Sequence, residues 1–82
     1  MPLLRITCPA DATPVVVALL EEEALASEVT VVVGASRTFV DGDVVLAEVP
    51  RASIDEIVLL LRDAEGERVH HVTLQPSELL FP

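Results

Sequence analysis

A glycine, two hydroxyl side chains and an arginine follow a valine-rich segment, in the stretch GASRT at residues 34–38. Backbone N–H groups around such a glycine, together with an arginine, can bind a small anion as a nest. A phosphate-binding P-loop, however, needs a lysine after its second glycine and a helix behind it. This chain has no lysine, and Gly42 leads into an apolar segment typical of a strand. The segment therefore predicts a plain hairpin connection, in which Gly34, Ser36 and Arg37 are the residues that would bind an anion.

Cys8 and Asp11 are the other two residues whose spacing suggests a ligand. The stretch ITCPADATPVVVAL resembles the start of heavy-metal-associated domains, in which a Cys-x-x-Cys loop follows the first strand. Here the second cysteine is replaced by Asp11, and a thiolate with a hard carboxylate is a poor site for Cu(I). Four-coordinate zinc would need further ligands from elsewhere in the chain. We predict a buried cysteine and a helix cap, with Cys8 and Asp11 as weak candidates for a metal carrier.

The remaining titratable residues indicate no catalytic site. His70 and His71 are neighbours on a predicted strand, so their side chains point to opposite faces and cannot chelate one ion together. Asp41 and Asp43 flank Gly42, which is ordinary turn composition. The sequence contains neither a G-x-S-x-G nor an H-E-x-x-H motif. We therefore predict a protein that is not an enzyme and needs no cofactor.

Charge and composition limit the classes of partner that the protein can bind. Fourteen acidic residues face five arginines, which gives a net charge of −9 that repels phosphate backbones and anionic lipid headgroups. The aromatic residues are Phe39 and Phe81 alone, so stacking platforms for bases are missing. A single cysteine fits a reducing compartment, and neither a secretion signal nor a membrane span is evident. We expect a cytoplasmic domain that does not bind nucleic acid.

The order of predicted elements defines a fold. We expect one domain over residues 1–82, with strands at 3–8, 28–34, 43–49 and 68–75 and helices at 12–25 and 51–63. The second helix carries the clearest apolar stripe, formed by Ile54, Ile57, Val58 and Leu61. Right-handed crossovers in each βαβ half and a central hairpin predict a ferredoxin-like βαββαβ sandwich of the α+β class. Its four-stranded antiparallel sheet would carry both helices on one face.

This fold leaves one face of the sheet open. We expect Leu3, Arg5 and Thr7 on that face, together with alternate valines of the middle strands. An uncovered surface rich in valine is a candidate interface. The second strand should lie at a sheet edge, and an apolar edge tends to pair with another strand. Both features favour a homodimer, formed through the open face or through an edge strand.

Several stretches resemble one family of membrane proteins. They are RITCPADATPVVVALLEEE, VVVGASR, GDVVLAEVPRASIDEIVLLLRD and VHHVTLQPSE, and together they cover most of the chain. They are similar to the N-terminal region of the domain-of-unknown-function family number 389, bacterial proteins often described as hydrophobic-domain proteins. In that family a soluble N-terminal part precedes a block of transmembrane helices. The resemblance implies that these 82 residues are either an excised domain, attached in the whole protein to a membrane-embedded domain, or a free-standing relative. It implies no activity and no functional residues.

The sequence thus favours a non-enzymatic regulatory or protein-interaction domain, a dimerising soluble appendage of a membrane protein. Two alternatives stay open. The first is a small-ligand sensor of the amino-acid-binding regulatory type, which has the same topology and binds its ligand at a dimer interface. The second is a metal carrier that uses Cys8.

Overall fold

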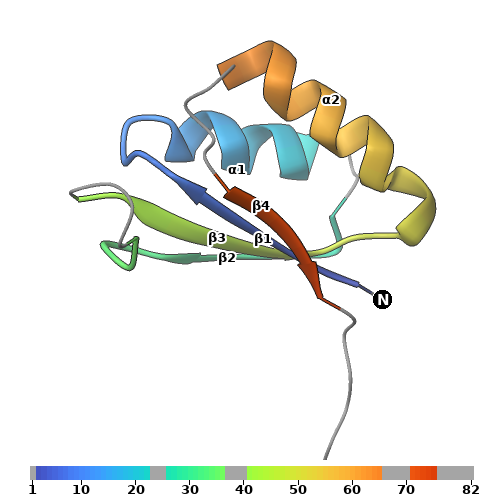
Figure 1. The fold of residues 1–82 in the computed structure, drawn as a ribbon, viewed down its shortest axis with the longest axis horizontal. Coiled ribbons are helices and arrows are strands. Elements are labelled where there is room, and N and C mark those ends of the chain that lie inside the picture. The colour runs from blue at the N-terminus through green and yellow to red at the C-terminus, as the bar shows by residue number, and fades with distance from the viewer. Residues whose placement is uncertain (1, 23–25, 37–40, 66–70, 76–82) are drawn as a thin grey trace, which may run out of the picture.

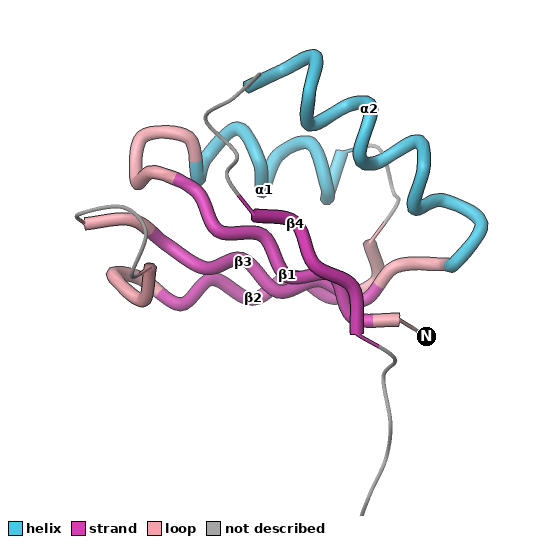
Figure 2. Tube along the Cα trace, viewed as in Figure 1, coloured by secondary structure: helices cyan, strands magenta, loops and turns pink. Residues whose placement is uncertain are grey.

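A computed structural model shows a single sheet with two helices (Figure 1). It describes residues 2–22, 26–36, 41–65 and 71–75. Along the chain the elements are β1 (Leu3–Cys8), α1 (Thr13–Glu22), β2 (Glu28–Val32), β3 (Asp43–Glu48), a 3₁₀ turn (Arg51–Ser53), α2 (Ile54–Glu65) and β4 (His71–Gln75). Both helices lie on one side of the sheet, and none of the described elements covers the other side (Figures 1 and 2).

The strand order is β2-β3-β1-β4, and every neighbouring pair is antiparallel. β1 and β3 therefore form the centre of the sheet, whereas β2 and β4 form its edges. Each helix connects two parallel strands that have another strand between them, which is the split βαβ arrangement. The prediction of an α+β fold with ferredoxin-like order is confirmed, and β2 lies at the edge expected for it.

Several element ends differ from the sequence-based expectation. β2 ends at Val32 rather than at residue 34, because Gly34 turns the chain with a φ of 72°. β3 ends at Glu48, one residue before the expected end. Residues 51–53, expected to be α-helical, form the 3₁₀ turn, in which the N–H of Ser53 donates to the carbonyl of Pro50 (2.9 Å). The expected ends at residues 23–25 and 68–70 lie outside the described residues.

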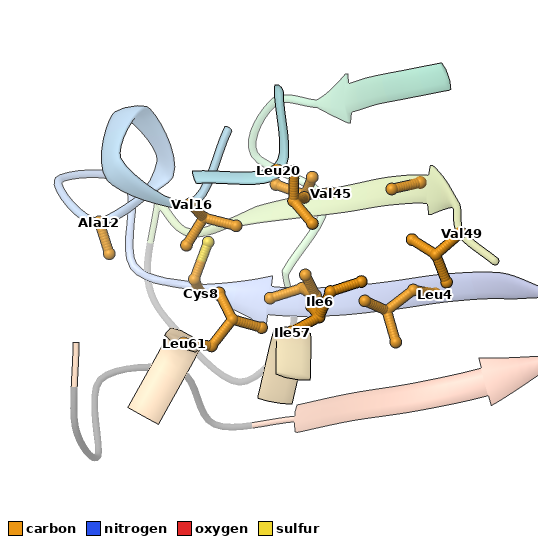
Figure 3. Close-up of a cluster of buried hydrophobic side chains, with 11 residues drawn as sticks. Leu4, Ile6, Cys8, Ala12, Val16, Leu20, Val45, Val49, Ile57 and Leu61 are labelled. Atoms are coloured by element: carbon orange, nitrogen blue, oxygen red, sulfur yellow. The ribbon is translucent and has the colours of Figure 1, made fainter. Parts of the chain in front are cut away.

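The core lies between the sheet and the helices (Figure 3). Strand pairing fixes which side chains enter it, since residues directly opposite each other point to the same face. Ile6 is paired with Val45 and Leu4 with Ala47, and all four side chains are buried. The members of the cluster are Leu4, Ile6, Cys8, Ala12, Val16, Leu20, Val45, Ala47, Val49, Ile57 and Leu61.

The two helices differ in the polarity of their solvent-facing surfaces. α2 has acids in its first turn and Arg62 in its last, an arrangement that suits the helix dipole. It buries Ile57 and Leu61, as its apolar stripe predicts. α1 is apolar around most of its circumference: it buries Val16 and Leu20 but leaves Val15 43% exposed. The outer surface of α1 is therefore unusually apolar for a helix that faces solvent.

The open face of the sheet carries Val32 and Val44 but not the other valines of β2 and β3. Leu3, Arg5 and Thr7 do lie there, since their partners in β3 are Glu48, Leu46 and Val44. The pairing of Val29 with Ala47 and of Val31 with Val45, however, turns these β2 valines toward the helices. Glu28 and Thr30 of β2 are exposed on the open face instead. This alternation makes the open face largely polar and weakens it as an apolar interface.

α1 has 10 residues and α2 has 12. A membrane span needs about 20 apolar residues, and no helix within residues 2–22, 26–36, 41–65 and 71–75 is long and apolar enough to cross a membrane.

The central position of Ile6 yields a prediction about stability. Ile6 is 0% exposed on a central strand, so Ile6→Ala removes buried methyl groups and leaves a cavity. We expect the free energy of unfolding to fall by about 2–5 kcal/mol, a large part of the about 5–15 kcal/mol typical of a whole domain. Urea denaturation followed by circular dichroism measures this. Leu59→Ala, at a position 60% exposed on α2, is the control and should cost about 0.5 kcal/mol or less.

Candidate functional site

Asp43 connects three parts of the fold at the start of β3. The hydroxyl of Thr13, the first residue of α1, donates to Asp43 Oδ2 at 2.6 Å. The backbone N–H of Gly34, in the β2–β3 connection, donates to Asp43 Oδ1 at 2.9 Å. Only 6% of the Asp43 residue surface is exposed, and both carboxylate oxygens have a donor. The carboxylate therefore holds the start of α1 and the hairpin turn against β3.

Cys8 extends this network into the core. Its Sγ lies 3.5 Å from the Thr13 hydroxyl oxygen, and the residue is fully buried. A hydroxyl has one hydrogen, and an ionised carboxylate can only accept. The Thr13 proton therefore goes to Asp43, and the Cys8 thiol donates to the Thr13 oxygen. Figure 3 shows Cys8 on β1 beside Val16 of α1.

These hydrogen bonds set the charge of Asp43. The Thr13 hydroxyl, and after it the Gly34 N–H, lower the pKa of Asp43, while burial raises it by less. The net result is a pKa below the ordinary value, so Asp43 is ionised at neutral pH. A general acid or base works best with a pKa near the operating pH. Asp43 is therefore suited to a structural role rather than to proton transfer.

An apolar groove lies beside this network, between α1 and β2. Its volume is about 510 Å³. α1 contributes Pro14, Val17 and Ala18 to its walls, and β2 with the turn that follows contributes Val31 and Val33. Val33 is 81% exposed, so this wall is open to solvent. The groove thus offers apolar contacts to an occupant from outside the chain.

Polar groups lie at both ends of the groove. Thr13 and Asp43 are at one end, where their oxygens are already hydrogen-bonded to each other. Glu21 and Glu22, near the C-terminal end of α1, are exposed along the lining. A shallower hollow continues over the outer surface of α1 past Val15. The α1–β2 side is therefore an apolar surface with an acidic rim.

The structure describes two of the three residues predicted to bind an anion, Gly34 and Ser36. The Gly34 N–H, which was expected to face an anion, donates to Asp43 instead, so the protein's own carboxylate occupies that position. The N–H of Ser36 donates to the carbonyl of Gly42 (3.2 Å), which closes the hairpin connection. Arg37 lies outside the described residues. The geometry of Gly34 and Ser36 is that of a hairpin held by an internal aspartate.

The candidate metal ligands lie in different environments. Cys8 is fully buried, whereas Asp11 is exposed. A metal carrier needs a thiolate that a partner can reach, and the Cys8 thiol faces Thr13 inside the core. Across the described part of the chain, no three His, Cys, Asp or Glu residues are grouped to hold a metal ion. His70 lies outside the described residues, and the backbone of His71 belongs to β4.

No protein-family model matches the chain, and no curated protein matches it. The candidate site therefore rests on its geometry alone.

Sequence reasoning missed Asp43, which it assigned to a turn with Asp41. The signal was present in the alternation of β3: positions 43, 45 and 47 share one face, and Val45 and Ala47 are apolar core residues. An aspartate in register with two core residues must be buried, and a buried carboxylate needs donors. The donor Thr13 lies 30 residues away along the chain, so no local pattern identifies it.

The Asp43 network predicts how stability depends on pH. Because the folded-state pKa is lowered, Asp43 contributes stability that is present above its unfolded pKa of about 3.9 and is lost as pH falls through the folded pKa. Thr13→Val removes the largest cause, so the Asp43 pKa should rise toward its ordinary value. The difference between the free energies of unfolding at about pH 7 and about pH 2.5 should then shrink.

Carbon NMR of the Asp43 carboxyl and urea titrations at both pH values measure these two changes. Thr73→Val, at an exposed threonine of β4, is the matched control and should leave both unchanged. An Asp43 midpoint in Thr13→Val equal to that of the wild type would contradict the assigned cause.

Proposed function

We propose that this chain is a non-enzymatic regulatory or protein-interaction domain that works as a homodimer. The observation that carries the proposal is the α1–β2 side. There the apolar outer surface of α1 adjoins an edge strand, and the two border an open apolar groove of about 510 Å³.

The composition of α1 supports an interface on this side. A helix that is apolar all round is normally covered on all sides. α1 turns Val16 and Leu20 into the core but leaves Val15 43% exposed, and Ala18 and Leu19 are only half-buried. The outer surface of α2 exposes Leu59, but charged side chains surround it, namely Asp55, Glu56, Arg62 and Asp63. The contrast favours α1 as the helix that a partner covers.

Charge supports a protein partner. A net charge of −9 opposes contact with nucleic acid and with anionic lipid headgroups. The groove rim itself is acidic, through Glu21 and Glu22. The second copy of a homodimer brings the same carboxylates to this side, so apolar contact must hold the pair together against their repulsion.

The proposal includes a place in a larger protein. The resemblance to the N-terminal region of family number 389 supports a cytoplasmic appendage of a membrane-embedded domain. The coding sequence downstream of residue 82 tests this. Several apolar spans of about 20 residues would support the appendage, and an uninterrupted polar continuation would contradict it.

Ligand sensing is the second candidate, because the groove volume falls within the range of about 300–1,000 Å³ common for small-molecule sites. This role requires that an amino acid, a nucleotide or a small anion raise the melting temperature in a thermal-shift screen. A screen in which none of them stabilises the protein would remove it.

The dimer is tested by sedimentation over micromolar to millimolar concentrations. Val15→Asp places a charge on the outer surface of α1, and the first helical turn tolerates an acid well. We expect the dissociation constant to rise at least about tenfold, equivalent to about 1.4 kcal/mol. Leu59→Asp, on the exposed surface of α2, is the control and should leave it unchanged. A wild-type monomer throughout the concentration range would overturn the proposal.

A further inference from the structure

We infer that two copies of this chain pair through β2, strand against strand and antiparallel, about a two-fold axis that passes midway between the two copies of Thr30. This inference rests on the proposed function, because it names the interface through which the homodimer forms.

The edge of β2 is available for pairing. β2 is an outer strand of the sheet, and in the described part of the chain only β3 pairs with it. Proteins usually protect such an edge with lysine, proline, a bulge or a covering segment. The sequence of β2, EVTVV, contains neither lysine nor proline, and its pairing with β3 is regular from Glu28 to Val32. β2 can therefore accept a further strand.

The length of β2 selects one register. β2 has five residues, and Thr30 is the middle one. In a two-fold antiparallel pair, a residue on the axis faces its own copy, and the other residues pair symmetrically about it. Only an axis midway between the two copies of Thr30 pairs all five residues of β2. It places Val29 opposite Val31 of the second copy and Glu28 opposite its Val32.

The charges of β2 agree with this register. Glu28 is the acidic residue of the strand, and in this register it faces a valine rather than the Glu28 of the second copy. Like charges directly opposite each other destabilise a strand pair, whereas β-branched pairs stabilise it. The two Val29–Val31 pairs lie on the helix side, because both residues pack against the core. The pairing therefore avoids a direct contact between the two Glu28 side chains and places β-branched residues opposite each other.

The helices distinguish β2 from the other edge. α1 contacts β2, and Val31 shares the groove with Val17 and Ala18 of α1. A two-fold axis perpendicular to the sheet keeps the helices of both copies on one side, so the apolar outer surfaces of the two α1 helices approach each other. The two four-stranded sheets join into one sheet of eight strands. This edge thus buries apolar helix surface as well as pairing backbone.

The same geometry opposes the dimer through charge. Each copy has a net charge of −9, and Glu21, Glu22 and Glu28 lie on the joined side. Salt screens repulsion between exposed charges. The dimer should therefore become tighter as salt rises, the reverse of an interface held by ion pairs.

Cysteine cross-linking tests the register. Thr30, Glu28 and Val32 are exposed on the open face, so their replacement leaves the core intact. Directly opposed residues have Cα atoms about 4.5–5.5 Å apart, within the range of about 4.4–6.8 Å that a disulfide accepts. Thr30→Cys should therefore form a disulfide-linked dimer under mild oxidation. An equal mixture of Glu28→Cys and Val32→Cys should form a mixed disulfide.

Control variants test where the two-fold axis lies and which edge strand forms the interface. Val32→Cys alone should not link to itself, because two residues on each side of the axis separate the pair by about 13 Å. Thr73→Cys is the matched control on the other edge strand, since it is an exposed threonine in the middle of β4. We expect at least about tenfold more linked dimer from Thr30→Cys than from Thr73→Cys, because pairing raises the effective concentration of the thiols. Wild-type protein, whose Cys8 is buried, should not link.

The possible outcomes distinguish a dimer that uses another interface from the absence of any dimer. A wild-type dimer whose Thr30→Cys variant stays unlinked overturns the β2 interface and leaves the proposed function intact. Linking of Thr73→Cys instead transfers the interface to β4 and also overturns the inference. Self-linking of Val32→Cys as strong as that of Thr30→Cys overturns the register. A wild-type monomer at every concentration overturns both the interface and the proposed function.

Discussion

The alternation of side chains along four paired strands is the constraint on which the rest of this structure depends. Both helices lie on one face of the sheet, so one side chain in two enters the core and the next faces the open side. The register of β1 with β3 determines that Leu4, Ile6, Val45 and Ala47 pack together. The α1–β2 groove and the polar open face both follow from this one pattern.

The same alternation places a carboxylate where an apolar residue would be expected. Asp43 is in register with Cys8, at the end of the strand pair where α1 begins and the hairpin turns. There it meets the Thr13 hydroxyl and the Gly34 N–H, so its charge stays solvated by donors from the chain. A single side chain thereby links the first residue of α1 to the turn that follows β2.

The sequence predicts the element order and the edge position of β2, because hydrophobic periodicity and turn residues are local signals. The sequence does not predict the features that depend on a residue far away along the chain. Which β2 valines face the helices depends on register with β3, and the role of Asp43 depends on Thr13, 30 residues away. The apolar character of α1 was visible in VVVALL, but its significance required knowing that α1 adjoins an edge strand.

The two hydrogen bonds of Asp43 close chain loops of different length. Gly34 and Asp43 are nine residues apart, so they meet when the β2–β3 hairpin closes. Thr13 and Asp43 are 30 residues apart, and bringing them together costs more chain entropy. Breaking the Thr13 bond therefore releases a longer loop than breaking the Gly34 bond, so the start of α1 gains more chain entropy on release than the turn does.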